Sequence, residues 1–444
     1  MTFRKLALIN VVRNKRVYTA YFLSSVFSVS VFFIYALFAF HPAFTIDIIG
    51  GYVSFGMHFA ELIIYIFSIF FVLYSMSAFL KSRKKEFGIL AINGMSDMQL
   101  RRLVFLENML IGFFATSSGI LIGLLFAKLL LLISERALGM TSELPFYFPW
   151  QALLLTFLSF FILFLFISIF TTSFVRGSQL IDLFTGGAKP KPTPKASRAL
   201  SYLAVILLGL GYTIALLVKE AMVFFAMIPV TIIVIIGTYL FYTQLSVYFL
   251  NWVRKKKRIY QHKTNLVVFS YLIYRMKDNA QMFFIVTIVL TITFSSIGTL
   301  VGIRTMLIET TVIARQGIDI VLFIGLFIGA VFFISSGSFL YFRLYTDLED
   351  DKRQFGAIAK LGLTDKELST IITLRLALLF FFPILVATIH GAVSLTAMQN
   401  MFSYPLALES ILVLGSFFII QVVYFLIMRA HYLIQIKKDI IIHN

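Results

Sequence analysis

The chain has 444 residues, of which 60% are hydrophobic and 13% are charged, and its net charge is +18. A soluble globular domain has a charged fraction near a quarter, so this composition excludes that class and predicts a polytopic membrane protein. The chain contains no cysteine, which excludes disulfides, a thiolate nucleophile and cysteine-based metal sites.

Several apolar runs are long enough to cross a hydrocarbon layer as helices, which takes about 20 residues. We predict an all-α fold of ten transmembrane helices, near residues 18–40, 55–80, 108–132, 148–175, 200–218, 222–244, 280–303, 319–342, 371–396 and 409–429. Partly polar stretches at 3–16 and 266–277 precede helices one and seven. Each is either an interfacial elbow helix or a cytoplasmic extension of the helix that follows.

The positive charge is distributed unevenly along the chain. Of the 38 lysines and arginines, 33 lie near the two ends, after even-numbered helices or at the start of helix nine. This asymmetry follows the positive-inside rule and predicts that both termini are cytoplasmic. It also accounts for the net charge without a nucleic-acid partner.

The predicted helices fall into a four-two-four arrangement. Residues 1–176 hold the first four helices, 177–199 form a proline-containing cytoplasmic linker, and 200–250 form a two-helix insert. Residues 251–444 hold the last four helices, with a short loop at 304–318 between helices seven and eight. Two glycine pairs with small-xxx-small spacing, Gly119 with Gly123 and Gly325 with Gly329, are candidates for close helix contacts.

One polar segment occurs twice, once in each half of the chain. Residues 86–100 read EFGILAINGMSDMQL and follow helix two, and residues 354–368 read QFGAIAKLGLTDKEL and follow helix eight. We name these segments hinge 1 and hinge 2. In each, a glycine predicts a left-handed helix end, and a hydroxyl residue three before Gln or Glu predicts a capping box.

The matching positions favour a docking role for the hinges, because a plain connector does not need the same Phe-Gly, glycine and cap twice. The plain-connector reading remains the alternative. The candidate docking residues are Glu86, Phe87, Gly88, Gly94, Asp97 and Gln99 in hinge 1, and Gln354, Phe355, Gly356, Gly362, Asp365 and Glu367 in hinge 2.

No catalytic residues are predicted, because the chain has no Walker motif and no Ser/His/Asp cluster on a large polar loop. The six histidines lack ligand-like spacing, so no metal site is predicted. An ion-coupled carrier is disfavoured by the shortage of midplane charge. Glu107 and Arg375 are separated by the same offset as the two hinges; they either pair across a pseudo-twofold axis or snorkel independently toward the cytoplasm.

The residues of hinge 1 resemble a known family. Lys85 to Leu90, Gly94-Met95, Gln99-Leu100 and Glu107-Asn108 look like the coupling segment of FtsX-like ABC transporter permeases. The run from Phe3 to Phe40 and the four-two-four layout are closer still to the Bce-type permeases of antimicrobial-peptide sensing and resistance.

The resemblance implies that the hinges are coupling helices that dock on a separate dimeric ATPase. That ATPase would hold ATP and Mg²⁺, so no cofactor is expected on this chain, and it would drive mechanotransmission to the outer face. Further implied are one permease with two ATPases, a sensor histidine kinase partner, a Gram-positive plasma membrane, and release of lipid-linked cell-wall precursors from peptides such as bacitracin. The alternative is a non-transporting FtsX-type scaffold that controls a cell-wall hydrolase or a kinase.

One departure from the family concerns the loop at 304–318, where Bce-type permeases carry a large extracytoplasmic domain. A loop of this length cannot hold such a domain. We therefore expect ATPase coupling to be retained and peptide recognition to be impaired.

Overall fold

The computed structural model describes residues 15–42, 48–138, 147–173, 195–220, 222–261, 264–306, 351–360, 362–402 and 407–442, with scattered positions between 322 and 348. These residues are helical apart from turns and short connections, in agreement with the predicted all-α fold. Eight helices in the described part are long and apolar enough to cross a membrane.

The predicted count of ten spans is therefore confirmed only in part. The apolar part found in the second predicted span, Glu61–Ser77, is shorter than a full crossing, and much of the eighth, near 319–342, lies outside the described residues. Residues 3–14 of the first elbow stretch, most of the linker and most of the 304–318 loop also lie outside them. The cytoplasmic placement of the termini stays a prediction.

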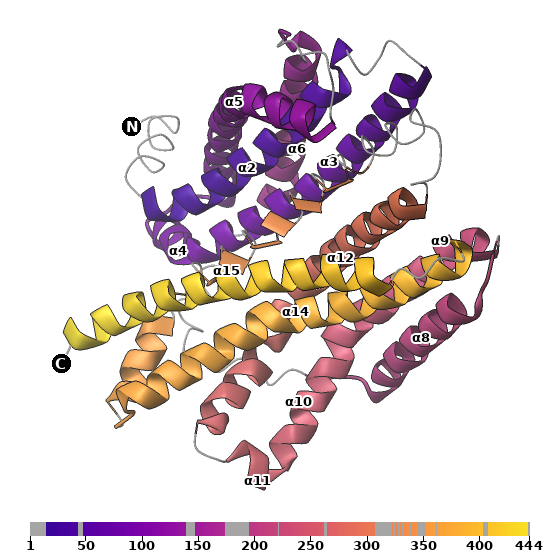
Figure 1. Cartoon of the computed structure of the whole chain (residues 1–444). Helices are drawn as coiled ribbons and strands as arrows, with labels where there is room; N and C mark the ends of the chain where they lie inside the picture. The colour runs from indigo at the N-terminus through magenta and orange to yellow at the C-terminus, as the bar shows by residue number, and fades with distance from the viewer. Residues whose placement is uncertain are drawn as a thin grey trace. The chain divides into compact units, whose positions relative to one another are not determined.

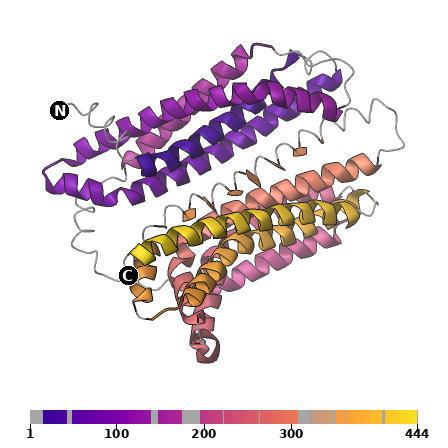
Figure 2. The same ribbon diagram turned by 60° about the vertical axis from the view of Figure 1, so that its left-hand side comes forward.

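The first half is a bundle around α2 (Figure 1, Figure 2). Helix α2 (Lys15–Ala39) packs against α3 (Ile48–Ser82), α5 (Asp97–Leu138) and α6 (Trp150–Ser173), and the short helix α4 (Lys84–Ile92) joins α3 to α5. Most of the apolar part of α2 is buried, whereas those of α5 and α6 are largely exposed. Helix α2 is therefore the core of this half, and the exposed faces of α5 and α6 suit contact with lipid.

Glycines set how closely the helices approach. A Cβ atom on Gly119 or Gly123 of α5 would overlap Val29 or Phe33 of α2, and the Ser30 hydroxyl of α2 donates to the Gly119 carbonyl at 3.0 Å. In the second half, a Cβ on Gly325 or Gly329 would overlap α12 side chains. Both predicted glycine pairs thus mark helix contacts.

The described elements of the insert and of the second half follow the linker. They are α8 (Arg198–Leu217), α9 (Met222–Leu240), a π-helical turn η2 (Phe241–Leu245), α10 (Ser246–Lys255), α11 (Lys257–Tyr260), α12 (Asn265–Met306), α14 (Asp365–Phe402) and α15 (Ala407–Ile442). Helix α12 packs along α14, and α15 contacts both. Because α12 is continuous, the stretch at 266–277 extends helix seven and is not a separate elbow helix.

The two-helix insert is joined to the second half by buried polar contacts. The imidazole of His390 on α14 lies 2.6 Å from the Tyr212 hydroxyl of α8 and 3.0 Å from the Thr238 hydroxyl of α9. Tyr242, in η2, is hydrogen-bonded to Thr287 of α12 at 2.7 Å, and Thr287 donates to the Pro383 carbonyl at 3.1 Å. The insert and the last helices therefore form one unit.

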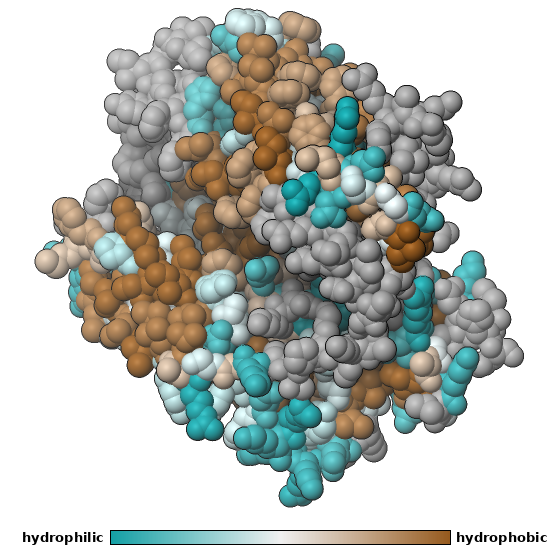
Figure 3. Space-filling view, turned by 180° about the vertical axis from the view of Figure 1, so that it is seen from behind, coloured by the Kyte–Doolittle hydropathy of each residue, from teal (hydrophilic) through white to brown (hydrophobic). Residues whose placement is uncertain are grey.

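The surface of the insert and of the start of the second half has an apolar part and a basic part. Apolar side chains of α8 and α9, such as Leu210, Phe225 and Ile228, are exposed, as expected for helices that face lipid. Hydrophilic residues gather at the lower end of Figure 3, where Figure 1 shows α11. All five residues from 254 to 258 in this region are basic and exposed.

Candidate functional site

Hinge 1 begins where α3 passes into α4. The helical hydrogen bonds continue through this junction, since the Arg83 amide donates to Phe79 at 3.3 Å and the Phe87 amide donates to Arg83 at 3.1 Å. Helix α4 ends in a Schellman motif, in which Gly94 donates to Ala91 at 3.0 Å and Met95 donates to Leu90 at 3.1 Å. The chain turns here because Gly94 has a φ of 89°, which L side chains rarely adopt.

The next helix starts with the predicted capping box in both hinges. In hinge 1, the Ser96 amide donates to Gln99 Oε1 at 2.9 Å, and the Gln99 amide donates to Ser96 Oγ at 3.4 Å. In hinge 2, the corresponding distances between Thr364 and Glu367 are 3.0 and 3.3 Å. Gly362 repeats the left-handed turn with a φ of 96°. The predicted helix end, turn and cap are confirmed.

The two hinge phenylalanines lie inside the protein. Phe87 is 2% exposed and Phe355 is 3% exposed, so neither ring is available to a docking partner. Each ring lies beside an arginine: the Arg83 guanidinium is 4.7 Å from the Phe87 centroid, and that of Arg375 is 5.9 Å from the Phe355 centroid. The rings therefore attach the hinges to their own halves.

The other predicted docking residues divide between the interior and the surface. Gly88 is buried and Gly356 is half-buried. Glu86 accepts a hydrogen bond from Arg83 at 2.8 Å, and Asp365 pairs with Lys437 at 3.2 Å. The remaining positions are exposed: Gly94, Asp97 and Gln99 in hinge 1, and Gln354, Gly362 and Glu367 in hinge 2.

Further exposed residues of the hinges were not among the predicted docking residues. In hinge 1 they include Ile89, Ile92 and Met98, which are 52%, 60% and 77% exposed. The repeat places Ala357, Lys360 and Lys366 at the equivalent positions of hinge 2, and these are also exposed. The two hinges therefore present different surfaces, one apolar and one partly basic.

A buried ion pair joins the two ends of hinge 1. The guanidinium of Arg83, three residues before the hinge, binds the carboxylate of Glu107 on α5, and both side chains are almost completely buried. The rings of Tyr18 and Phe79 lie 5.1 and 5.5 Å from the guanidinium carbon. Burial is the largest single effect and disfavours the charged guanidinium, but Glu107, Tyr18 and Glu86 together outweigh it and raise the pKa of Arg83 above its ordinary value.

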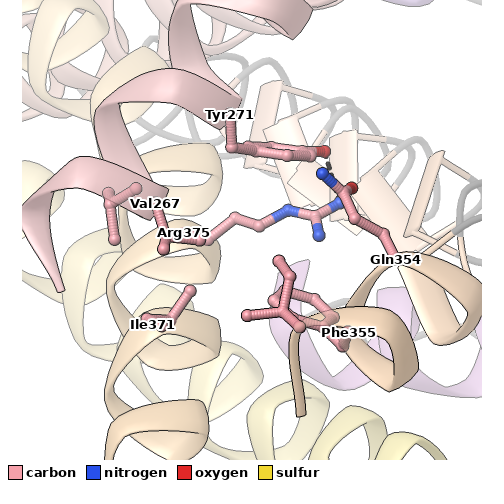
Figure 4. Close-up of a pocket in the computed structure, with 8 residues that line it drawn as sticks. Val267, Tyr271, Gln354, Phe355, Ile371 and Arg375 are labelled. Carbon is pink, nitrogen blue, oxygen red and sulfur yellow. Dashed lines mark hydrogen bonds between the residues drawn. The ribbon is translucent and has the colours of Figure 1, made fainter. Parts of the chain in front are cut away.

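A second buried ion pair joins the ends of hinge 2, and Figure 4 shows its arginine, Arg375, beside Tyr271 and Phe355. Arg375 of α14 binds the carboxylate of Asp351, three residues before the hinge, and also donates to the Tyr271 hydroxyl. The Tyr432 hydroxyl of α15 donates to the same carboxylate. The guanidinium carbon lies 3.5 Å from the Tyr271 centroid, so aromatic groups again surround the arginine.

The repeat retains the ion pair and reverses its polarity. Arg83 and Asp351 occupy equivalent positions of the two copies, as do Glu107 and Arg375. Glu107 and Arg375 thus each have a partner within their own half. A contact between Glu107 and Arg375 themselves stays a prediction. The sequence contains a signal for these partners that the sequence analysis missed. Arg83 and Asp351 also differ in charge and are separated by the same number of residues as Glu107 and Arg375.

The pocket at hinge 2 is small. The pocket beside Arg375, lined by Tyr271, Gln354 and Phe355 among others, has room for about one water molecule and is too small for a peptide or a lipid. Within the described part of the chain, no group of three or more His, Asp or Glu side chains is placed to hold a metal ion.

Comparison with known proteins identifies the family. The family described as FtsX-like permease C-terminal matches residues 58–180 and 326–440, so each match contains one hinge and one ion pair. The ABC transporter permease protein YxdM of Bacillus subtilis is 30% identical over 99% of this chain and 100% of its own length. The uncharacterized ABC transporter permease YvcS of the same organism is 26% identical over 97% of this chain and 99% of its own length.

A further relative is the bacitracin export permease protein BceB of Bacillus subtilis, which is 26% identical over 68% of this chain and 48% of its own length. These relatives are membrane subunits of ABC transporters, a class that works with an ATPase partner. The chain is a multi-pass membrane protein that belongs to the FtsX-like permeases of ABC transporters and, among them, to the Bce type.

Proposed function

We propose that the chain is the permease subunit of an ABC transporter for antimicrobial-peptide sensing and resistance in a Gram-positive cell membrane. A separate dimeric ATPase binds ATP and Mg²⁺ and hydrolyses the nucleotide, and this chain passes the resulting motion to the outer face of the membrane. The observation that carries the proposal is the duplicated hinge, because each copy has a buried inner side, an exposed outer side and the same capped turn into a long membrane helix.

The hinges receive the motion through their exposed residues. Ile89, Ile92 and Met98 form an apolar surface on hinge 1 that suits a hydrophobic groove on the ATPase. Hinge 2 offers Lys360 and Lys366 at the equivalent place, which suits a more acidic or polar groove. The two subunits of an ATPase dimer therefore bind different surfaces, one at each hinge. One permease chain binds both subunits of the dimer.

The relatives support the peptide function, whereas the length of the chain predicts that peptide recognition is impaired. BceB is named for bacitracin export, and this supports a bacitracin-like peptide or a lipid-linked cell-wall precursor as the ligand. The alignment with YxdM spans 627 positions, which exceeds the 444 residues of this chain by 183. We place that missing length in the loop at 304–318, and we propose a sensor histidine kinase as the receiver of the signal.

Docking is tested by co-purification with a candidate ABC ATPase subunit. The double variant Ile89→Asp, Ile92→Asp should lose the ATPase, because two charges replace the apolar surface of hinge 1. Ile434→Asp is the matched control, since Ile434 on α15 is 65% exposed and lies outside both hinges. Binding that survives the double variant, or is lost equally in the control, rules out docking through this surface.

A further inference from the structure

We propose that the two buried ion pairs are the braces through which the hinges move the membrane helices. Arg83–Glu107 makes hinge 1 and the start of α5 one rigid body, and Asp351–Arg375 does the same for hinge 2 and α14. These four side chains are positioning residues that act between the docking surface and the bilayer. The inference rests on the proposed ATPase coupling and names the residues that transmit it.

The need for a brace follows from the shape of the hinge. The chain between α4 and α5 turns at Gly94, and the local bonds there are those of the Schellman motif and the capping box. Such a turn lets α4 tilt relative to α5. Glu107 lies ten residues into α5, about 15 Å along its axis, and its bond to Arg83 ties α5 to the far end of the hinge. A tilt of α4 must then move α5 with it.

The same argument applies to hinge 2. Asp351 lies at the start of the described helical stretch 351–359, and Arg375 lies ten residues into α14. The Tyr432 hydroxyl also binds Asp351, so this brace includes α15 as well as α14. Hinge 2 is therefore tied to two membrane helices.

The reversed polarity of the two ion pairs indicates that the attraction within each pair matters, and that the sign of the charge at each position does not. All four side chains are at most 2% exposed, so none of them contacts an outside partner. If a partner read the charge, the sign would matter at each position, yet the two halves carry opposite signs at both positions. The feature that the halves share is the attraction between the two ends of the hinge.

The brace also explains the repeated phenylalanine. The arginine comes from the base of the hinge in the first half and from the membrane helix in the second half, but Phe87 and Phe355 lie beside it in both. The ring covers the ion pair on the hinge side and keeps it dry, which strengthens the attraction between the charges. The repeated phenylalanine is thus part of the brace.

The test uses charge reversal in the complex of this chain with its ATPase, reconstituted in lipid nanodiscs. The variants are Arg83→Glu, Glu107→Arg and their combination, and Asp351→Arg, Arg375→Glu and their combination. Because the chain has no cysteine, Leu125→Cys, at an exposed site on α5, carries a single fluorophore that reports the movement of α5. Leu385→Cys does the same for α14.

We expect each single reversal to retain ATPase binding and basal ATP hydrolysis but to lose the ATP-dependent fluorescence change in its own half. Each double variant should recover that change, because the attraction is restored with the opposite polarity. Arg102→Glu and Arg353→Glu make the same charge change at exposed positions and should leave the signal intact.

Other outcomes separate the two proposals. If the parent chain does not bind the ATPase, the proposed function fails. If the parent binds and signals, and the folded single reversals signal equally, only the brace is wrong. Where a single reversal does not fold, the double variant decides: a folded double that gives the signal supports the brace, and a folded double without the signal overturns it.

Discussion

At the scale of residues, the repeat separates two kinds of position. Phe87, Gly94 and the capping hydroxyl recur in hinge 2, and the structure shows that they build the interior, the turn and the helix start. Ile89, Ile92 and Met98 do not recur, and they are exposed. At these positions, identity between the copies marks the shared framework and difference marks exposed surface, whereas the buried ion pairs differ only in their polarity.

This distinction predicts the chemical accessibility of single cysteines. Ile89→Cys should react rapidly with a membrane-impermeant maleimide in inverted membrane vesicles, and Phe87→Cys should react slowly because its side chain is buried. The chain's lack of cysteine makes each reaction unambiguous. Addition of the ATPase should protect Ile89→Cys, and equal labelling of both sites in the free chain would contradict the buried position of Phe87.

A second residue-scale prediction concerns Asn108. Its side chain accepts from the Tyr21 hydroxyl of α2 and donates to Ser168 of α6, so it links three helices of the first half. Asn108→Leu leaves both hydroxyls without this partner and should lower the free energy of unfolding by about 1–3 kcal/mol. Thermal melting in detergent measures the effect. Ser117→Ala, which removes only a bond to the Phe113 carbonyl one turn away, should change melting little.

At the scale of elements, the sequence predicted the helix ends correctly but did not predict the contacts between distant residues. The glycine turn and the capping box depend on residues within one turn, so the sequence was sufficient for Gly94, Gly362 and both caps. The partners of Glu107 and Arg375 lie 24 residues away across a hinge, and their contact depends on how the helices pack. The π-helical turn η2 was also not predicted, because no local motif marks it.

The helix ends allow a prediction with an internal control. Gly94→Ala and Gly362→Ala each force an L side chain into a left-handed conformation and should cost about 1–2 kcal/mol of stability. Space is not the reason, since a Cβ at either position would meet no atom within 4 Å. Gly415→Ala lies within α15, also in open space, and should stabilise by about 0.5–1 kcal/mol. Equal melting shifts for all three variants would contradict this account.

At the scale of the whole molecule, the chain divides into a four-helix half and a larger unit that includes the insert. The sequence predicted a four-two-four order, but it did not show to which half helices five and six belong. His390 and Tyr242 decide this through contacts with side chains that are distant in the sequence. A linker rich in proline marks a boundary on the chain, while side-chain packing decides which parts join.

The whole-molecule prediction concerns the response to peptide. ATP hydrolysis by the reconstituted complex should not change on addition of bacitracin, because the chain is shorter by 183 positions than its alignment with YxdM. Hydrolysis without peptide should persist, since both hinges are intact. A BceB complex measured in parallel is the control, and stimulation of this chain by bacitracin would show that recognition does not need the missing length.

The reversed ion pairs also constrain the history of the duplication. If both halves descend from one ancestral unit, then one copy has exchanged its arginine for an acid and its acid for an arginine. A single exchange leaves two like charges buried together, and even the loss of one partner costs about 3–5 kcal/mol. The exchange therefore required paired changes or an interval in which the site was uncharged. The two copies are now separated by an evolutionary barrier, because a crossover within the hinges would join Arg83 to Arg375 or Asp351 to Glu107 and leave two like charges together.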